Sequence, residues 1–272
     1  MFSKLNVSVR TWMILGVVCT VLAGLTAIAW AQDAPEVPYP FFYLIKAKVD
    51  ATKMEGYMEA IGKIVDAHKQ HDNGNNWAAF APMFGGPEPV FYYFLPAGKL
   101  AELDDWLPNF KVVADIHGEA TADQIFRTVG ETSKTRSTLL AYAPGISNPN
   151  PDWSGTVPAF VDHMHIKAEP GKVTEYVALI KKLVAAHKDH PQGLHWVGYT
   201  VFAGGETGEF HFFIGMQKLG EMDAWPMGPE MIEEKYGKEE TAKLLSAFPK
   251  LAKARDELLA HNVEMSNLPP AP

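Results

Sequence analysis

The sequence predicts an α+β fold made of two tandem ferredoxin-like repeats, each β-α-β-β-α-β, that pair into a pseudo-dimeric α+β barrel. Three observations predict it. The chain of 272 residues aligns with itself without a gap at an offset of 119 positions. Each copy shows the same succession of strand-like and helix-like segments. A stretch rich in Pro, Gly, Asn and Ser, residues 144–158, separates the copies and has the composition of a linker.

The identities at this offset run along the whole module and include unusual residue types, which indicates a duplication. They are Ala67-His68-Lys69-x-His71 with Ala186-His187-Lys188-x-His190, Trp77 with Trp196, Gly85-Gly86 with Gly204-Gly205, Trp106 with Trp225, and Lys134-x-Arg136 with Lys253-x-Arg255.

Each copy begins with a strand, followed by an amphipathic helix and a hairpin. In the first copy we expect strand 41–49, helix 53–71, strands 77–84 and 90–95, further helical sequence, and a last strand at 138–143. In the second copy the corresponding ranges are 160–168, 172–190, 195–202, 210–216 and 257–263. The helix assignment rests on an apolar stripe at helical spacing, which in copy one is Tyr57, Ile61, Ile64, Val65 and His68.

The β-α-β-β-α-β order predicts a sheet with helices on one face only, so the other face needs a partner. Two copies in one chain can cover each other and enclose a cavity. Two such units resemble the dimeric α+β barrel superfamily, which includes antibiotic-biosynthesis monooxygenase-like, NIPSNAP-like and chlorite-dismutase-like proteins. The resemblance covers nearly all of residues 39–265 and concerns architecture alone. It implies a small-molecule cavity and, in some members, haem or cofactor-free oxidation.

The predicted boundaries are a signal peptide at 1–31, repeats at 39–146 and 158–265, a linker at 147–157, and a disordered tail at 266–272. Lys4 and Arg10 precede an uncharged stretch, and Ala29-Trp30-Ala31 offers small residues for cleavage. We therefore expect a secreted or periplasmic protein, with an uncleaved membrane anchor as the alternative.

Charge and cysteine content exclude several classes of function. The net charge is −8, and the only arginines after residue 31 are Arg127, Arg136 and Arg255. Such a chain does not suit nucleic acid, whose phosphates require a basic surface. Cys19, the one cysteine, lies in the predicted signal, so no thiol nucleophile or thiolate-bound haem is expected afterwards.

Residues kept in both copies are interpreted as scaffold. His68 and His187 lie on the apolar helix stripes, and a hydrogen-bonded structural role is favoured over a metal or acid–base site. The tryptophans present in both copies, Trp77 with Trp196 and Trp106 with Trp225, are interpreted as core residues in the same way. Arg136 and Arg255 occupy one repeat position, and we expect each to pair with a carboxylate of its own half: Glu102 or Asp104, and Glu221 or Asp223.

Residues that differ sharply between the copies are the candidates for a site. His163 and His165 are two apart on a strand and so share one face. The histidines of copy two and their copy-one counterparts are His163 with Leu44, His165 with Lys46, His195 with Asn76, His211 with Tyr92, and His261 with Tyr142. We therefore expect any active or binding site to belong to the copy-two sheet, and the absence of a site remains the alternative. The ligand-binding residues of such a site are predicted to be His163, His165, His211, His261, Tyr92 and Tyr142.

Three classes of function remain open. The favoured one is an exported barrel that binds a small apolar or aromatic molecule, because its strands are rich in aromatic residues. The second is an oxidoreductase that uses a divalent transition metal or haem held by His163, His165, His211 and His261. The third is an interaction or assembly protein, and a homo-oligomer is compatible with all three. No catalytic residue can be named, and the sequence does not decide whether the protein is an enzyme.

Overall fold

The computed structural model describes residues 39–71, 75–84, 88–104, 106, 108–151, 156–188, 190–225 and 229–268. The predicted signal peptide, residues 1–31, lies outside this part of the chain.

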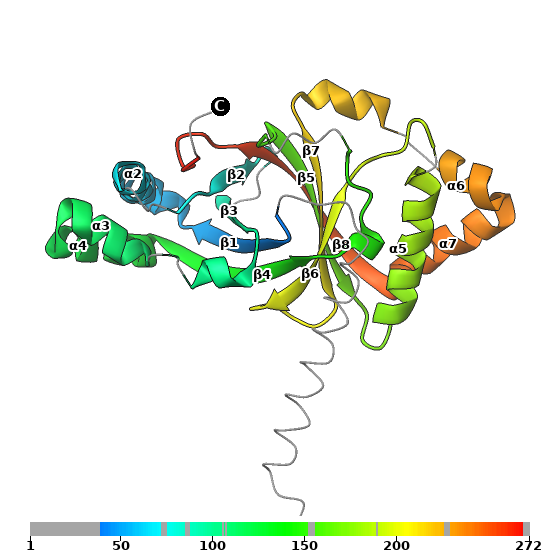
Figure 1. Ribbon diagram of the computed structural model, residues 1–272, viewed down its shortest axis with the longest axis horizontal. Helices are drawn as coiled ribbons and strands as arrows, with labels where there is room; N and C mark the ends of the chain where they lie inside the picture. Colours follow the sequence, from blue (N-terminus) through cyan, green and yellow to red (C-terminus); the bar gives the residue numbers. More distant parts are fainter. Residues whose placement is uncertain are drawn as a thin grey trace, which may run out of the picture.

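Eight antiparallel strands form one closed barrel, with helices packed on two opposite sides of it (Figure 1). The first half contains β1 (Phe41–Val49), α2 (Met54–Gln70), β2 (Ala78–Pro82), β3 (Val90–Ala97), α3 (Asn109–His117), α4 (Glu119–Thr132) and β4 (Ser133–Tyr142). The second contains β5 (Phe160–Ala168), α5 (Val173–Lys188), β6 (Val197–Ala203), β7 (Glu209–Met216), α6 (Glu230–Tyr236), α7 (Lys238–Leu251) and β8 (Ala252–His261). Short 3₁₀ turns lie at Ala51–Lys53, Leu100–Leu103, Pro144–Ile146 and Leu219–Ala224.

The strand order around the barrel is β1-β3-β2-β8-β5-β7-β6-β4, and β4 pairs with β1 to close it. Within the first half the sheet runs β4-β1-β3-β2, and the second half repeats this as β8-β5-β7-β6. The halves join through the antiparallel pairs β2–β8 and β4–β6. This confirms the α+β class, the barrel, and the resemblance in architecture to the dimeric α+β barrel superfamily.

The helical sequence after the hairpin forms two helices in each half, because a glycine breaks it. Gly118 separates α3 from α4 with φ 84°, and Gly237 separates α6 from α7 with φ 78°. A positive φ is accessible to glycine at little cost. The last strands also begin earlier than predicted, at Ser133 and Ala252.

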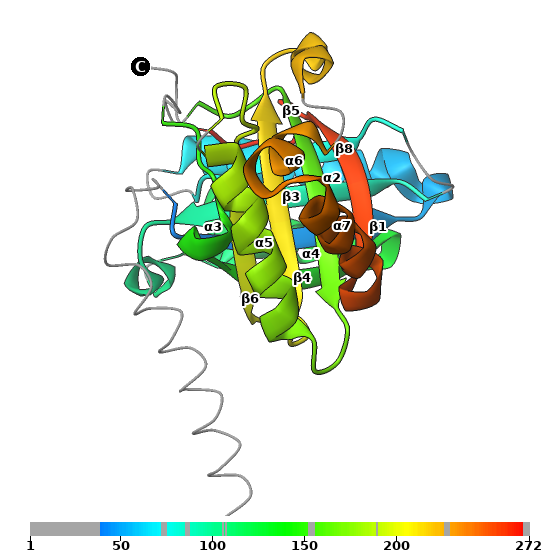
Figure 2. The ribbon, with the colours of Figure 1, turned by 90° about the vertical axis from the view of Figure 1, so that its right-hand side faces the viewer.

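Three apolar clusters fill the molecule. One lies between α2, α3, α4 and the outer face of the first sheet, and a second lies under α5, α6 and α7, which cover the other sheet in Figure 2. The third fills the barrel itself. Its buried members are Leu44, Ala78, Phe80, Tyr92, Phe94, Leu140, Val161, Val197, Tyr199, Phe213 and Leu259. Side chains alternate along a strand, so these residues identify the inward-facing positions.

The segments that follow β4 and β8 are each held by hydrogen bonds to the opposite half. The Trp196 indole donates to the Ile146 carbonyl at 2.8 Å, and the Trp77 indole donates to the Met265 carbonyl at 2.7 Å. Ser266 Oγ accepts from the backbone N–H of Ala79 at 2.9 Å. Ser266 was expected in a disordered tail, but it is buried, because it supplies partners to backbone groups of the first half.

His68 and His187, which occupy the same position in the two copies, are hydrogen-bonded structural residues, as expected. His68 Nδ1 accepts from the Asn75 backbone N–H at 3.1 Å, and His187 Nδ1 accepts from that of Leu194 at 3.1 Å. Each ring packs edge-on against the conserved tryptophan of its own half. These contacts fix the turn that leads from helix to strand in both halves.

Candidate functional site

Nine polar side chains lie at inward-facing or rim positions toward one end of the barrel, here called the polar end. They are Lys46, Tyr92, Arg136, His163, His165, Glu209, His211, Arg255 and Glu257. The register brings them together: Lys46 is opposite Arg136 and Tyr92, and His165 is opposite His211 and Arg255. Toward the other end the interior is mainly apolar, and Leu140 and Leu259 are fully buried there.

Three imidazoles form a stack inside the barrel, here called the imidazole stack (His163, His165 and His211). The ring centroids of His163 and His211 lie 5.3 Å apart with planes at 12°, and those of His165 and His211 lie 4.6 Å apart at 17°. Phe213 continues the stack beyond His163, at 4.7 Å. The prediction that His163 and His165 share a face with His211 is therefore confirmed by the geometry.

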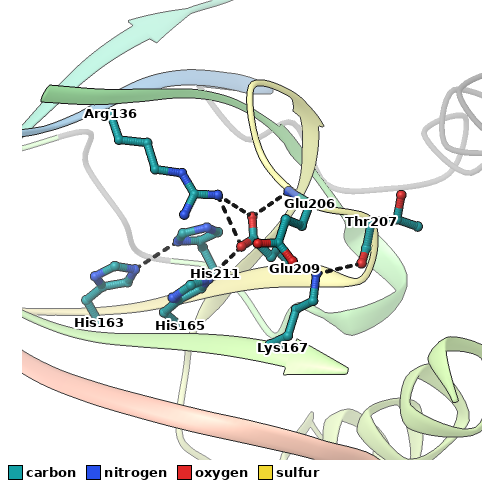
Figure 3. A network of polar contacts seen from close by, with 8 residues as sticks. All are labelled: Arg136, His163, His165, Lys167, Glu206, Thr207, Glu209 and His211. Atoms are coloured by element: carbon teal, nitrogen blue, oxygen red, sulfur yellow. Dashed lines mark hydrogen bonds and ion pairs between the residues drawn. The ribbon is translucent and has the colours of Figure 1, made fainter. Parts of the chain in front are cut away.

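A hydrogen bond ties the two deeper imidazoles together. His163 Nε2 and His211 Nδ1 lie 3.0 Å apart, so one nitrogen donates and the other accepts (Figure 3). His163 Nδ1 and His165 Nε2 are buried and have no hydrogen-bond partner among the described residues.

Burial keeps the imidazole stack uncharged at neutral pH. Loss of hydration holds the pKa of His163 well below its usual value of 6.5, and the neighbouring imidazoles add to the effect. Burial likewise lowers the pKa of His211 to about 3. For His165, burial lowers the pKa while the Glu209 carboxylate opposes the shift. The stack therefore offers neutral donors and acceptors.

A second network of polar side chains connects the two halves across the barrel. Lys46 Nζ donates to Tyr92 Oη at 2.5 Å, and Tyr92 Oη in turn donates to Glu257. Arg255 Nη2 donates to Glu257 Oε1 at 2.6 Å, from two positions away on the same strand. Burial, followed by the Glu257 carboxylate, raises the pKa of Tyr92, so its hydroxyl remains protonated. The Tyr92 and His163 rings meet edge to face at 5.5 Å, which joins this group to the imidazole stack.

Arg136 and Glu209 form an ion pair at the rim, shown in Figure 3. Arg136 Nη2 lies 3.2 and 3.1 Å from the two carboxylate oxygens of Glu209. The Glu206 backbone N–H donates to Glu209 Oε2 at 2.9 Å, and His165 Nε2 lies 3.7 Å from Oε1. The Glu209 side chain is 5% exposed and that of Arg136 is 51% exposed. The ion pair therefore joins a buried carboxylate to a guanidinium that reaches solvent.

The expected arginine pairs within each half were wrong. Arg136 pairs with Glu209 of the other half, and Arg255 pairs with Glu257 on its own strand. Both arginines occupy inward-facing strand positions, which face away from the helix-side segments that carry the expected acids. Glu102 instead accepts from the Gly98 backbone N–H at 2.7 Å, and Glu221 accepts from two backbone N–H groups of its own turn.

The structure does not bring His261 or Tyr142 to the polar end. Ala260 pairs with Phe160, the first residue of β5, so His261 lies beyond that strand and far from His165. His261 Nε2 contacts Ser266 Oγ at 3.0 Å. Tyr142 packs against Tyr199, with ring centroids 5.8 Å apart. The polar end therefore holds three of the four predicted histidines, with Tyr92 beside them. His261 pairs with the inward-facing Phe80, so it shares the inward face but lies toward the other end of the barrel.

The described residues do not form a metal site with three or more protein ligands. Within the described ranges, no group of three or more His, Cys, Asp or Glu side chains could hold a metal ion. His163 Nε2 and His211 Nδ1 bind each other. Aromatic side chains of the interior cluster fill the space beside the stack.

Comparisons with known proteins concern architecture only. No protein-family model and no curated protein sequence matches the chain. Similar solved structures include an anthrone oxidase-like protein, with 12% identity and a TM-score of 0.49 over 85% of this chain and 97% of that one. A provisionally assigned monooxygenase of Fusobacterium nucleatum subsp. nucleatum has 11% identity and a TM-score of 0.49, over 83% and 94%. A variant of chlorite dismutase from Candidatus Nitrospira defluvii has 10% identity and a TM-score of 0.48, over 84% and 94%.

A likeness at this level does not define an activity. The fold assignment rests on the strand order of the chain itself. Among the described residues, no helix is long and apolar enough to cross a membrane.

Proposed function

We propose that this chain is an exported protein that binds a small organic molecule at the polar end of its barrel. In this proposal residues 1–31 direct export to the periplasm or the medium. Residues 39–146 and 158–265 are two ferredoxin-like repeats derived from one module, which act as a pseudo-dimer. The site belongs mainly to the second repeat, because its histidines have no counterpart in the first.

One observation supports binding most directly. His163 Nδ1 and His165 Nε2 are buried in the barrel without hydrogen-bond partners among the described residues. A buried polar atom without a partner costs about 1–3 kcal/mol, so native proteins rarely leave such atoms unpaired. A ligand with polar groups on one edge would supply those partners.

The exposure of the rim side chains also supports binding at the polar end of the barrel. Arg136 and Arg255 stand at the rim with half or more of each side chain exposed, whereas His163 behind them is buried. A molecule bound at this rim would contact the charged groups and the ring of His165, whose side chain is 32% exposed. These surroundings suit a molecule with one polar and one apolar part.

The test is to give the second half the residues of the first. The variant His163→Leu/His165→Lys replaces both imidazoles by the side chains at matched positions. We expect the purified wild-type chain to retain an organic molecule, detected by native mass spectrometry and solvent extraction, and the variant to lose most of it. The matched control is His195→Asn, which replaces an exposed imidazole outside the barrel by its own counterpart.

Circular dichroism and urea unfolding must show that the double variant remains folded. If it does not, His211→Tyr provides a milder change of the same kind. Retention of the same molecule in the same amount by the folded variant would contradict the proposal. So would a wild-type chain that neither carries an organic molecule nor is stabilised by any member of a screening panel. Elemental analysis and a visible spectrum of the same preparation test the metal and haem alternative.

A further inference from the structure

The polar end carries more positive than negative charge, although the chain as a whole is acidic. Lys46, Arg136 and Arg255 face two carboxylates, Glu209 and Glu257. The imidazole stack adds no charge at neutral pH. A local excess of positive charge on a protein of net charge −8 favours approach of an anion to this end of the barrel.

The cations also have hydrogen-bonding capacity that the described residues leave unused. A guanidinium has five N–H donors, but Arg136 and Arg255 each donate to a side chain only through Nη2. Lys46 Nζ makes one hydrogen bond, to Tyr92, and lies 3.8 Å from Glu257. The Arg136 and Arg255 side chains are 51% and 60% exposed, so these donors can reach an incoming molecule.

Shared contacts bring these cations close to one imidazole. Arg255 is opposite His165 on the β5–β8 pair, and Arg136 binds the Glu209 carboxylate, which lies 3.7 Å from His165 Nε2. Lys46 lies 3.8 Å from Glu257, the carboxylate that Arg255 also binds. All three cations act electrostatically on His165 and lower its pKa. Burial lowers the pKa of Lys46 most, and Arg255, Lys48 and Arg136 lower it further against the opposing effect of Glu257. The cations therefore repel one another, and an anion among them would relieve that repulsion.

We propose that the molecule bound at the polar end is an organic carboxylate, whose anionic group is held by Arg136, Lys46 and Arg255 over His165. This inference rests on the proposed function and names the class of its ligand. A carboxylate matches the planar fork of a guanidinium and can accept from Lys46 as well. Its organic part would lie toward the imidazole stack, where His165 offers the outermost ring of the stack.

The experiment uses three probes of one shape and different charge: benzoate, benzamide and benzamidine. Each is titrated into the full mature chain by calorimetry, while the histidine ring resonances are followed by NMR. We expect benzoate to bind about tenfold or more tightly than neutral benzamide and to shift the His165 signals, with no binding of benzamidine. Its affinity should fall as salt is raised, because the rim is open to solvent.

Variants test the assignment of the cations. Arg136→Gln should weaken benzoate binding by about tenfold or more, since a charge-assisted hydrogen bond is lost, and Arg255→Gln should weaken it as well. Arg127→Gln is the matched control, because Arg127 is an exposed arginine on α4, outside the barrel. It should leave the affinity unchanged. Arg136→Gln also removes the ion partner of the buried Glu209, so circular dichroism must show that this variant is folded. If it is not, Arg255→Gln, at a more exposed position, carries the test.

The outcomes separate this inference from the proposed function. If benzamide or benzamidine shifts the His165 signals as strongly as benzoate, the barrel binds small molecules but the carboxylate assignment is wrong. If benzoate binds and Arg136→Gln and Arg127→Gln behave alike, the anion lies elsewhere and the assignment is also wrong. If no probe perturbs the imidazole stack at millimolar concentration while an organic molecule co-purifies with the chain, only the carboxylate inference is overturned.

Discussion

Acid should destabilise the fold through His211, by an amount that the burial of this residue determines. The pKa of His211 falls from 6.5 to about 3 on folding, so between these values the unfolded chain binds a proton that the folded chain does not. Stability is therefore lost as pH falls below about 6.5 and is recovered as pH rises. From pH 7 to pH 5 the loss for this one group is about 2 kcal/mol.

Other groups change over the same range, so the measurement must be a difference. His163 acts in the same direction as His211, because burial also lowers its pKa. Asp162 acts in the opposite direction: burial, with Asp256 beside it, raises its pKa to about 8, so its contribution to stability declines as pH rises toward 8. The total pH dependence of the wild type combines these effects, whereas replacing His211 alone removes one of them.

The assay is urea unfolding at pH 7, 6 and 5 for the wild type and for His211→Tyr, which introduces the residue at the matched position of the first half. On acidification the wild type should lose about 2 kcal/mol more free energy of unfolding than the variant. His195→Asn, the exposed control, should follow the wild type. A difference below about 0.5 kcal/mol between wild type and His211→Tyr would refute the burial argument, since that is the usual error of such extrapolations.

Two further predictions concern stability at neutral pH. Arg136→Met should cost about 2–4 kcal/mol, because it leaves the buried Glu209 carboxylate without its ion partner, whereas Arg255→Met should cost about 1 kcal/mol or less at its more exposed position. Equal losses for the two variants in urea unfolding would contradict this ranking. Trp77→Phe and Trp196→Phe should each cost about 1–3 kcal/mol, because each leaves a backbone carbonyl of the opposite half without its donor. A loss near zero for either, measured by thermal unfolding, would show that the indole bond is dispensable.

The sequence predicts local structure well here because the same pattern of strand-like and helix-like segments occurs in both copies. The first strands and the main helices lie where the periodicity places them, and side-chain alternation on β5 correctly puts His163 and His165 on one face. His261 was placed wrongly because alternation does not reveal where along a neighbouring strand a residue lies. That depends on strand register, and the register puts His261 beyond the first residue of β5.

The partners of Arg136 and Arg255 could not be found within one repeat, because β4 of the first half closes against β6 of the second. A signal for the acids was nevertheless present. Glu209 is matched by Val90 and Glu257 by Thr138, so both differ as sharply between copies as the histidines do. Extending the comparison from histidines to all ionisable residues would have found them.

A barrel closed by one chain has a consequence for what its interior can contain. In a barrel built from two identical subunits, every inward-facing residue occurs twice, once on each side of the symmetry axis. Three imidazoles would then become six, and each buried carboxylate would lie in the same barrel as its own copy. Here His163 is matched by Leu44 and Glu257 by Thr138, so the interior can combine neutral bases on one wall with Lys46 and Tyr92 on the other. A single chain can thus evolve unlike walls around one ligand, an arrangement that a symmetric pair of subunits cannot reach by point mutation.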